Sequence, residues 1–108
     1  MNRYKYLLLL LVSLLNLRAF AQQTADSAYQ VRGFIIAAPK PSGLDDFVKF
    51  INEELAPRKV NTLILRVDFN YEYKSHPELR DSAALSKSEV HKIMDACKKN
   101  NIAIIPQI

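Results

Sequence analysis

Apolar residues in the second part of the chain follow two different periods, which alternate along the sequence. Three short runs are continuously apolar or alternate apolar with polar residues, as strands do: residues 31–38, 62–69 and 101–108. Two longer runs carry apolar residues at helical spacing: residues 44–55 and 90–97. Strands that alternate with helices in this way favour an α/β fold with a parallel sheet.

The residues between these runs predict where the helices begin and end. Ser42 is expected to cap the first helix, with Asp45 returning a hydrogen bond, and Pro57 ends it. Ser86 and Glu89 have the spacing of a capping box at the start of the second helix.

The same spacing predicts which side chains are buried. The second strand is expected to turn one set of residues toward the helices: Leu63, Leu65, Val67 and Phe69. Its other face would carry Arg66 and Asp68 near the carboxyl end. The second helix is expected to bury one stripe: Val90, Ile93, Met94 and Cys97.

The first 21 residues have the pattern of a secretory signal peptide. Arg3 and Lys5 precede an aliphatic run, and Ala19-Phe20-Ala21 has the small residues of a cleavage site. We therefore expect an exported protein, periplasmic or secreted, with no permanent membrane span after cleavage. Residues 22–30 are polar and are expected to form a flexible mature amino terminus.

Charge and composition exclude several classes of function. The leader holds three of the 15 basic residues and none of the 11 acidic ones, so 12 basic and 11 acidic residues remain after it. This balance gives no reason to expect nucleic-acid binding. Gly33 and Gly43 are the only glycines, which excludes a glycine-rich nucleotide loop, and Cys97 is the only cysteine. We predict no cofactor and no metal site, and we expect Cys97 to be buried as a small apolar residue.

Polar residues gather where the predicted strands end, which is where parallel folds place their sites. Arg66 and Asp68 can form an ion pair, and that pair is either structural or in contact with a ligand. Asp68 and Gln107 end neighbouring strands, so their polar groups either converge on a polyhydroxylated ligand or belong to a packing layer.

The long segment 70–85 adds further candidates: Asn70, Tyr71, Tyr73 and His76. Tyr71 and Tyr73 have flat amphipathic rings that suit a sugar, although such residues also fix a loop to the rim of a sheet. His76 lies in this candidate site loop, directly before Pro77.

Four segments, in this order, resemble the amino-terminal part of a glycoside hydrolase family 20 catalytic barrel: KVNTL at 59–63, SHPEL at 75–79, LSKSEV at 85–90 and NIAIIPQI at 101–108. This family contains the β-N-acetylhexosaminidases. The resemblance implies that residues 31–108 form an incomplete TIM-type (β/α)8 barrel, comprising the first two βα units and the third strand. It also implies a carbohydrate substrate that carries N-acetylhexosamine or a related sugar.

This chain departs from the family in three places. Lys40 lies where the family has an arginine, residues 64–70 replace its histidine-rich second strand, and Gln107 lies where the third strand of the family has a glutamate. The catalytic Asp-Glu pair of the family lies at the end of a fourth strand, so we expect no catalytic residue among these 108 residues and no hydrolysis by this chain alone. The resemblance therefore implies the amino-terminal fragment of a divergent, exported glycoside hydrolase-like protein.

Two alternatives remain open at this point. One is a carbohydrate-binding barrel without catalytic activity, and the other is a small secreted α/β protein that completes its sheet by oligomerising. The oligomeric state itself does not follow from the sequence.

Overall fold

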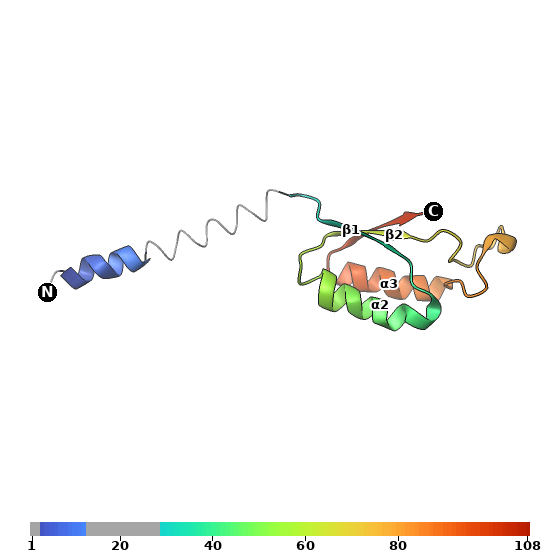
Figure 1. The fold of residues 1–108 in the computed structure, drawn as a ribbon, viewed down its shortest axis with the longest axis horizontal. Helices are drawn as coiled ribbons and strands as arrows, with labels where there is room; N and C mark the ends of the chain where they lie inside the picture. The colour runs from blue at the N-terminus through green and yellow to red at the C-terminus, as the bar shows by residue number, and fades with distance from the viewer. Residues whose placement is uncertain (1–2, 13–28) are drawn as a thin grey trace. The chain divides into compact units, whose positions relative to one another are not determined.

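The computed structural model describes residues 3–12 and 29–108 (Figure 1). The chain divides into two units between residues 30 and 31, and each is described by itself. Residues 3–12 are helical, whereas the predicted cleavage site and most of the predicted flexible segment lie outside the described residues. Among the helices that the structure describes, none has the length and apolar character needed to cross a membrane.

Residues 31–108 form a three-stranded parallel sheet with helices on one of its faces (Figure 1). The strands are paired in the order β1 (Gly33–Ala37), β2 (Thr62–Arg66) and β3 (Ala103–Gln107). The covering helices are α2 (Leu44–Phe50), which continues as a π-helical turn at Ile51–Leu55, and α3 (Lys87–Lys99). The predicted α/β class is confirmed, because the unit combines helices with a small parallel sheet.

The register of the strands divides the sheet into two different faces. Phe34 pairs with Leu63 and Ile36 pairs with Leu65, so these side chains share the face that carries the helices. Ile35, Ile64 and Ile105 lie in register across the opposite face. Ile35 and Ile105 are 59% and 49% exposed, so the described elements leave this face open. We call it the open face.

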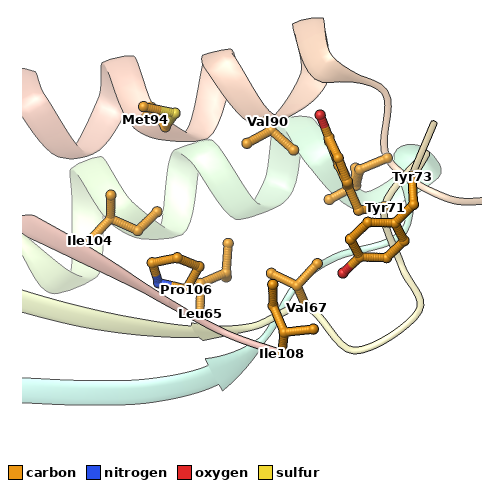
Figure 2. A pocket seen from close by; sticks show the side chains of 10 residues that line it. Leu65, Val67, Tyr71, Tyr73, Val90, Met94, Ile104, Pro106 and Ile108 are labelled. Atoms are coloured by element: carbon orange, nitrogen blue, oxygen red, sulfur yellow. The ribbon is translucent and has the colours of Figure 1, made fainter. Parts of the chain in front are cut away.

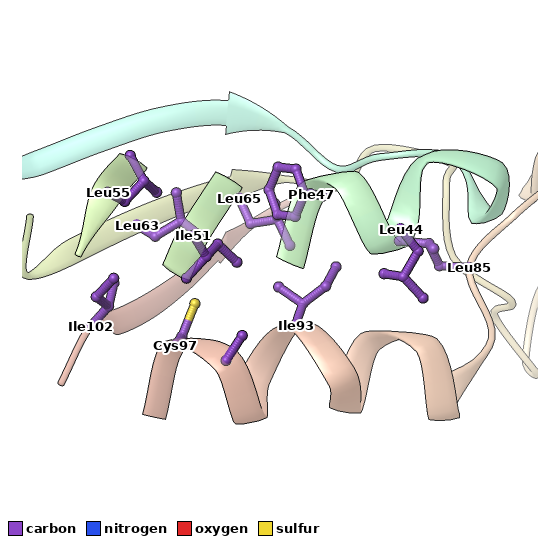
Figure 3. Close-up of a cluster of buried hydrophobic side chains, with 11 residues drawn as sticks. Leu44, Phe47, Ile51, Leu55, Leu63, Leu65, Leu85, Ile93, Cys97 and Ile102 are labelled. Carbon is purple, nitrogen blue, oxygen red and sulfur yellow. The ribbon is translucent and has the colours of Figure 1, made fainter. Parts of the chain in front are cut away.

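The core lies between the sheet and the two helices (Figure 3). Its buried members come from both strands and helices: Leu44, Phe47, Ile51, Leu55, Leu63, Leu65, Leu85, Ile93, Ala96, Cys97 and Ile102. In Figure 3, Ile93 and Cys97 point from α3 toward Ile51 and Leu63. Burial of each large aliphatic side chain contributes roughly 1.5–3 kcal/mol, so this cluster is the main stabilising feature of the unit.

Three predicted details of the fold are wrong. Ser42 does not cap α2, because the helix is preceded by a 3-10 turn at Pro41–Gly43 and Gly43 occupies the cap position without a side-chain hydrogen bond. Phe69 is 56% exposed, because β2 ends at Arg66 and Asp68 then has a positive φ of 48° that breaks the alternation of faces. Met94 is 42% exposed, because it lies on a flank of α3 that no described element covers.

The capping box at the start of α3 is confirmed. The Ser86 hydroxyl accepts a hydrogen bond from the Glu89 backbone N–H, and the Glu89 carboxylate accepts one from the Ser86 backbone N–H at 2.7 Å. The Ser86 hydroxyl also donates a hydrogen bond of 2.8 Å to the Glu89 carboxylate. The bonds that this carboxylate accepts, first from the Ser86 backbone N–H and then from the Ser86 hydroxyl, lower the pKa of the Glu89 carboxyl. The cap therefore stabilises the fold at neutral pH, and its contribution is lost as the pH falls through that lowered pKa.

Cys97 is fully buried in the core, as predicted. Burial raises the pKa of its thiol, so the reactive thiolate is scarce at neutral pH. We expect the folded chain to react with a thiol-specific disulfide reagent at least about a hundredfold more slowly than the chain unfolded in guanidinium chloride. Equally fast labelling with and without denaturant would contradict the burial of this residue.

Candidate functional site

The carboxyl ends of β2 and β3 bring three predicted site residues together. Arg66 and Gln107 are paired in the register of β2 and β3, so their side chains project from the open face next to each other. The Nε atom of Arg66 lies 3.4 Å from Oδ2 of Asp68, which confirms that these two residues pair. Both side chains are more than half exposed, so the pair is accessible to a ligand and contributes little to stability.

Asp68 is also held through its backbone. The Tyr73 hydroxyl donates a hydrogen bond of 2.8 Å to the Asp68 carbonyl oxygen, so the loop after β2 is fastened to the turn that carries the carboxylate. The rings of Tyr71 and Tyr73 meet edge to face, with centroids 5.2 Å apart. Such pairs are favourable contacts, and this one fixes the position of both rings.

Asn70 connects this turn to the segment that follows β1. Its side-chain amide donates hydrogen bonds to the carbonyl oxygens of Ala38, at 3.2 Å, and Pro39, at 2.8 Å. The exposed Lys40 directly follows Pro39. Asn70 thereby fixes the backbone next to Lys40, and its own Oδ1 atom is buried with no hydrogen-bond partner among the described residues.

His76 lies in the exposed part of the loop, where its Nδ1 atom is 3.0 Å from Oε1 of Glu78. The backbone N–H of Glu78 and then His76 lower the pKa of the Glu78 carboxyl. His76 also lines a shallow pocket of about 150 Å³ together with Asp68 and Tyr73. The structure thus brings His76 near the strand-end residue Asp68, whereas Lys40 lies on the segment that follows β1.

A larger apolar pocket, which the sequence did not predict, lies between β3, α3 and the loop after β2. Its volume is about 380 Å³, and its lining is almost wholly apolar: Leu65, Val67, Tyr71, Tyr73, Leu85, Val90, Met94, Ile104, Pro106 and Ile108. In Figure 2, the two tyrosines close one end, and Met94 and Ile104 lie at the other. Tyr71 therefore faces this pocket on the helix side of the sheet, whereas Tyr73 lines both this pocket and the shallow pocket beside Asp68.

Comparison with known proteins gives no direct indication of function. No family model matches the chain, and no curated protein matches it. Within residues 3–12 and 29–108, no group of three or more histidine, cysteine or acidic side chains is placed to hold a metal ion. Function therefore has to be inferred from the residues at the strand ends.

Proposed function

We propose that the carboxyl ends of the strands form a carbohydrate-contacting surface of an exported, glycoside hydrolase-like protein. The observation that carries this proposal is the grouping of a guanidinium, a carboxylate and an amide at one end of the open face, from Arg66, Asp68 and Gln107. Together these groups supply both donors and acceptors, which the hydroxyls and the acetamido group of a sugar require.

The surrounding residues support this assignment. The ring of Tyr73 is fixed beside Asp68 through its hydroxyl and offers an amphipathic surface to a sugar, and His76 adds a polar group to the same shallow pocket. In barrel proteins, side chains from the strand ends and the following loops jointly form the binding site. The sequence resemblance indicates which class of sugar would bind, namely N-acetylhexosamine or a related sugar.

The open face is also compatible with the interior of a barrel. It carries branched isoleucines in the middle of the strands and polar residues at their carboxyl ends. Barrel interiors are filled by branched side chains and have their sites at the carboxyl ends of the strands. An incomplete TIM-type barrel, of which this unit comprises two βα units and a third strand, is therefore the architecture that we propose.

Sugar binding can be measured by titrating the isotope-labelled, purified chain with N-acetylglucosamine and its β1,4-linked disaccharide, using cellobiose as the comparison sugar. We expect weak, saturable amide shifts that centre on Arg66, Asp68 and Gln107, and no hydrolysis of an aryl N-acetylglucosaminide. Arg66→Met should weaken binding by about tenfold, which corresponds to the loss of one charge-assisted hydrogen bond of about 1.4 kcal/mol.

Arg58→Met is the matched control, because Arg58 is an exposed arginine that pairs with Glu54 away from the strand ends. It should leave the sugar affinity unchanged. The absence of saturable shifts, or an equal loss of affinity in both variants, would refute the assignment of this surface to sugars.

A further inference from the structure

The side-chain amide of Asn70 is fully engaged within the chain. Its nitrogen donates to the carbonyl oxygens of Ala38, at 3.2 Å, and Pro39, at 2.8 Å, and an amide nitrogen has only two hydrogens to donate. Its Oδ1 atom is buried, so the hydroxyl groups of a ligand do not reach it. Asn70 therefore has neither a donor nor an acceptor left for a sugar, although its place in the sequence makes it a candidate ligand.

The Asn70 side chain continues the bonding between β1 and β2 where the backbone ladder stops. The Ala38 N–H still donates to the Arg66 carbonyl, at 2.8 Å, but β2 ends at Arg66 and the chain turns at Asp68, whose φ is 48°. The carbonyl groups of Ala38 and Pro39 are bonded by the Asn70 amide instead of a strand. A side chain thus replaces the strand at the end of the sheet where the proposed site lies.

The backbone of Asn70 also holds the turn that carries Asp68. The Asn70 N–H donates to the Val67 carbonyl at 2.9 Å, which closes this turn, and the Asn70 carbonyl accepts from the N–H of the buried Leu85 at 3.4 Å. A positive φ is uncommon for a residue other than glycine and persists where the surrounding structure holds it. Asn70 therefore joins three segments: the end of β1, the turn at Asp68 and the segment before α3.

We propose that Asn70 is a positioning residue of the carbohydrate-contacting surface: it holds the Asp68 turn against the segment after β1 and does not itself touch the sugar. This inference rests on the proposed function, because it concerns the same surface. The Asp68 carboxylate is exposed, so its place before a sugar arrives depends on the turn and on its pair with Arg66. Without the Asn70 amide, the turn would have to be ordered when the sugar binds, and this cost lowers the affinity.

A second asparagine provides the matched control. Asn100 is half-buried like Asn70, and its amide donates to Oδ1 of Asn52, at 2.7 Å, and to the Ala96 carbonyl, at 2.8 Å. It lies between α3 and β3, at the amino ends of the strands and away from the proposed surface. Asn70→Ala and Asn100→Ala each remove two hydrogen bonds, so both variants lose stability, but only the first alters the strand-end surface.

Sugar titrations of the two folded variants compare their affinities. We expect Asn70→Ala to bind the β1,4-linked disaccharide of N-acetylglucosamine about fivefold more weakly than the native chain, the usual cost of ordering one loose group. Asn100→Ala should bind it as the native chain does, and circular dichroism should show that both variants are folded. Equal affinity of Asn70→Ala and the native chain, or an equal loss in both variants, would overturn the positioning role.

The native chain alone distinguishes positioning from direct contact, even if Asn70→Ala does not fold. During the titration, the side-chain amide resonances of Asn70 should shift less than those of Gln107, which belongs to the proposed surface. Shifts at Asn70 as large as those at Gln107 would identify Asn70 as a ligand and overturn the proposal.

A double variant tests whether Asn70 acts through the Asp68 turn. Asp68→Asn should weaken sugar binding about tenfold in the native chain but only about twofold in the Asn70→Ala background, because a misplaced carboxylate contributes little. Additive effects would overturn the proposal. A native chain that binds no sugar would refute the proposed function itself, whereas sugar binding that is unaffected by Asn70→Ala refutes the positioning role alone.

Discussion

Ile93→Ala is expected to lower the free energy of unfolding by about 3–4 kcal/mol, the usual cost of removing a large aliphatic side chain from a packed core. Ile93 is fully buried and points from α3 into the cluster beneath the sheet (Figure 3). A unit of this size has a total stability of roughly 4–12 kcal/mol, so this one change removes a large share of it. Urea unfolding followed by circular dichroism measures the difference.

Met94→Ala provides the control in the same helix, one residue away. Because Met94 is 42% exposed, we expect its replacement to cost no more than about 1 kcal/mol. A cost as large as that of Ile93→Ala would mean that the flank of α3 is covered in solution, and it would contradict the open apolar pocket beside β3.

Much of this fold follows from the period of the apolar residues. Leu63 and Leu65 alternate with polar or partly exposed neighbours, and this pattern alone predicts both the strand and its buried face. The capping box of Ser86 and Glu89 is likewise a local signal, since its two hydrogen bonds form within one helical turn. Local spacing thus predicts β2 and the start of α3 correctly, whereas the equally local pair of Ser42 and Asp45 fails because a 3-10 turn precedes α2.

The incorrect predictions for Phe69 and Met94 depend on information that is not local. Phe69 continues the alternation in the sequence, but the positive φ of Asp68 ends the strand before it. Met94 lies on the apolar stripe of its helix, yet it is buried only if another element packs there. Backbone turns and missing neighbours are both properties of the tertiary structure, so the spacing of residues does not report them.

At the candidate site too, some contacts follow from the sequence pattern and others depend on the tertiary structure. The sequence predicts that Asp68 and Gln107 end neighbouring strands at one edge of the sheet. The register instead places Arg66 beside Gln107, and Asp68 is joined to this end of the sheet through its ion pair with Arg66. The hydrogen bonds of Asn70 to two carbonyl groups depend on the path of two loops that lie about 30 residues apart in the sequence. The sequence suggests Asn70 as a sugar ligand, whereas the contacts that its side chain makes depend on the tertiary structure.

These contacts give Asn70→Asp a large expected effect. The introduced carboxylate would lie against the carbonyl oxygens of Ala38 and Pro39, to which the native amide donates. It removes both donors and places a negative charge beside two acceptors in a half-buried position, so we expect a loss of stability of about 3 kcal/mol or more at neutral pH. Thermal or urea unfolding at several pH values measures this loss.

The pH dependence of the variant follows from the same geometry. Partial burial and the nearby carbonyl oxygens favour the protonated acid, so the pKa of the introduced carboxyl is raised in the folded state. The folded variant therefore binds a proton more readily than the unfolded chain, and its stability relative to the native chain should fall as the pH rises through that raised pKa. Between about pH 4 and pH 7, the difference from the native chain should widen.

Asn70→Ala separates the lost donors from the added charge. It should cost about 1–3 kcal/mol, because the two carbonyl groups lose their partner, and this cost should not change over the same pH range. If Asn70→Asp and Asn70→Ala were equally stable at every pH, the Asn70 side chain would not lie against the two carbonyl groups. If both instead behave as expected, Asn70 is the residue that fixes the backbone beside Lys40 to the turn beside Asp68, and any contribution of Lys40 to sugar binding would depend on it.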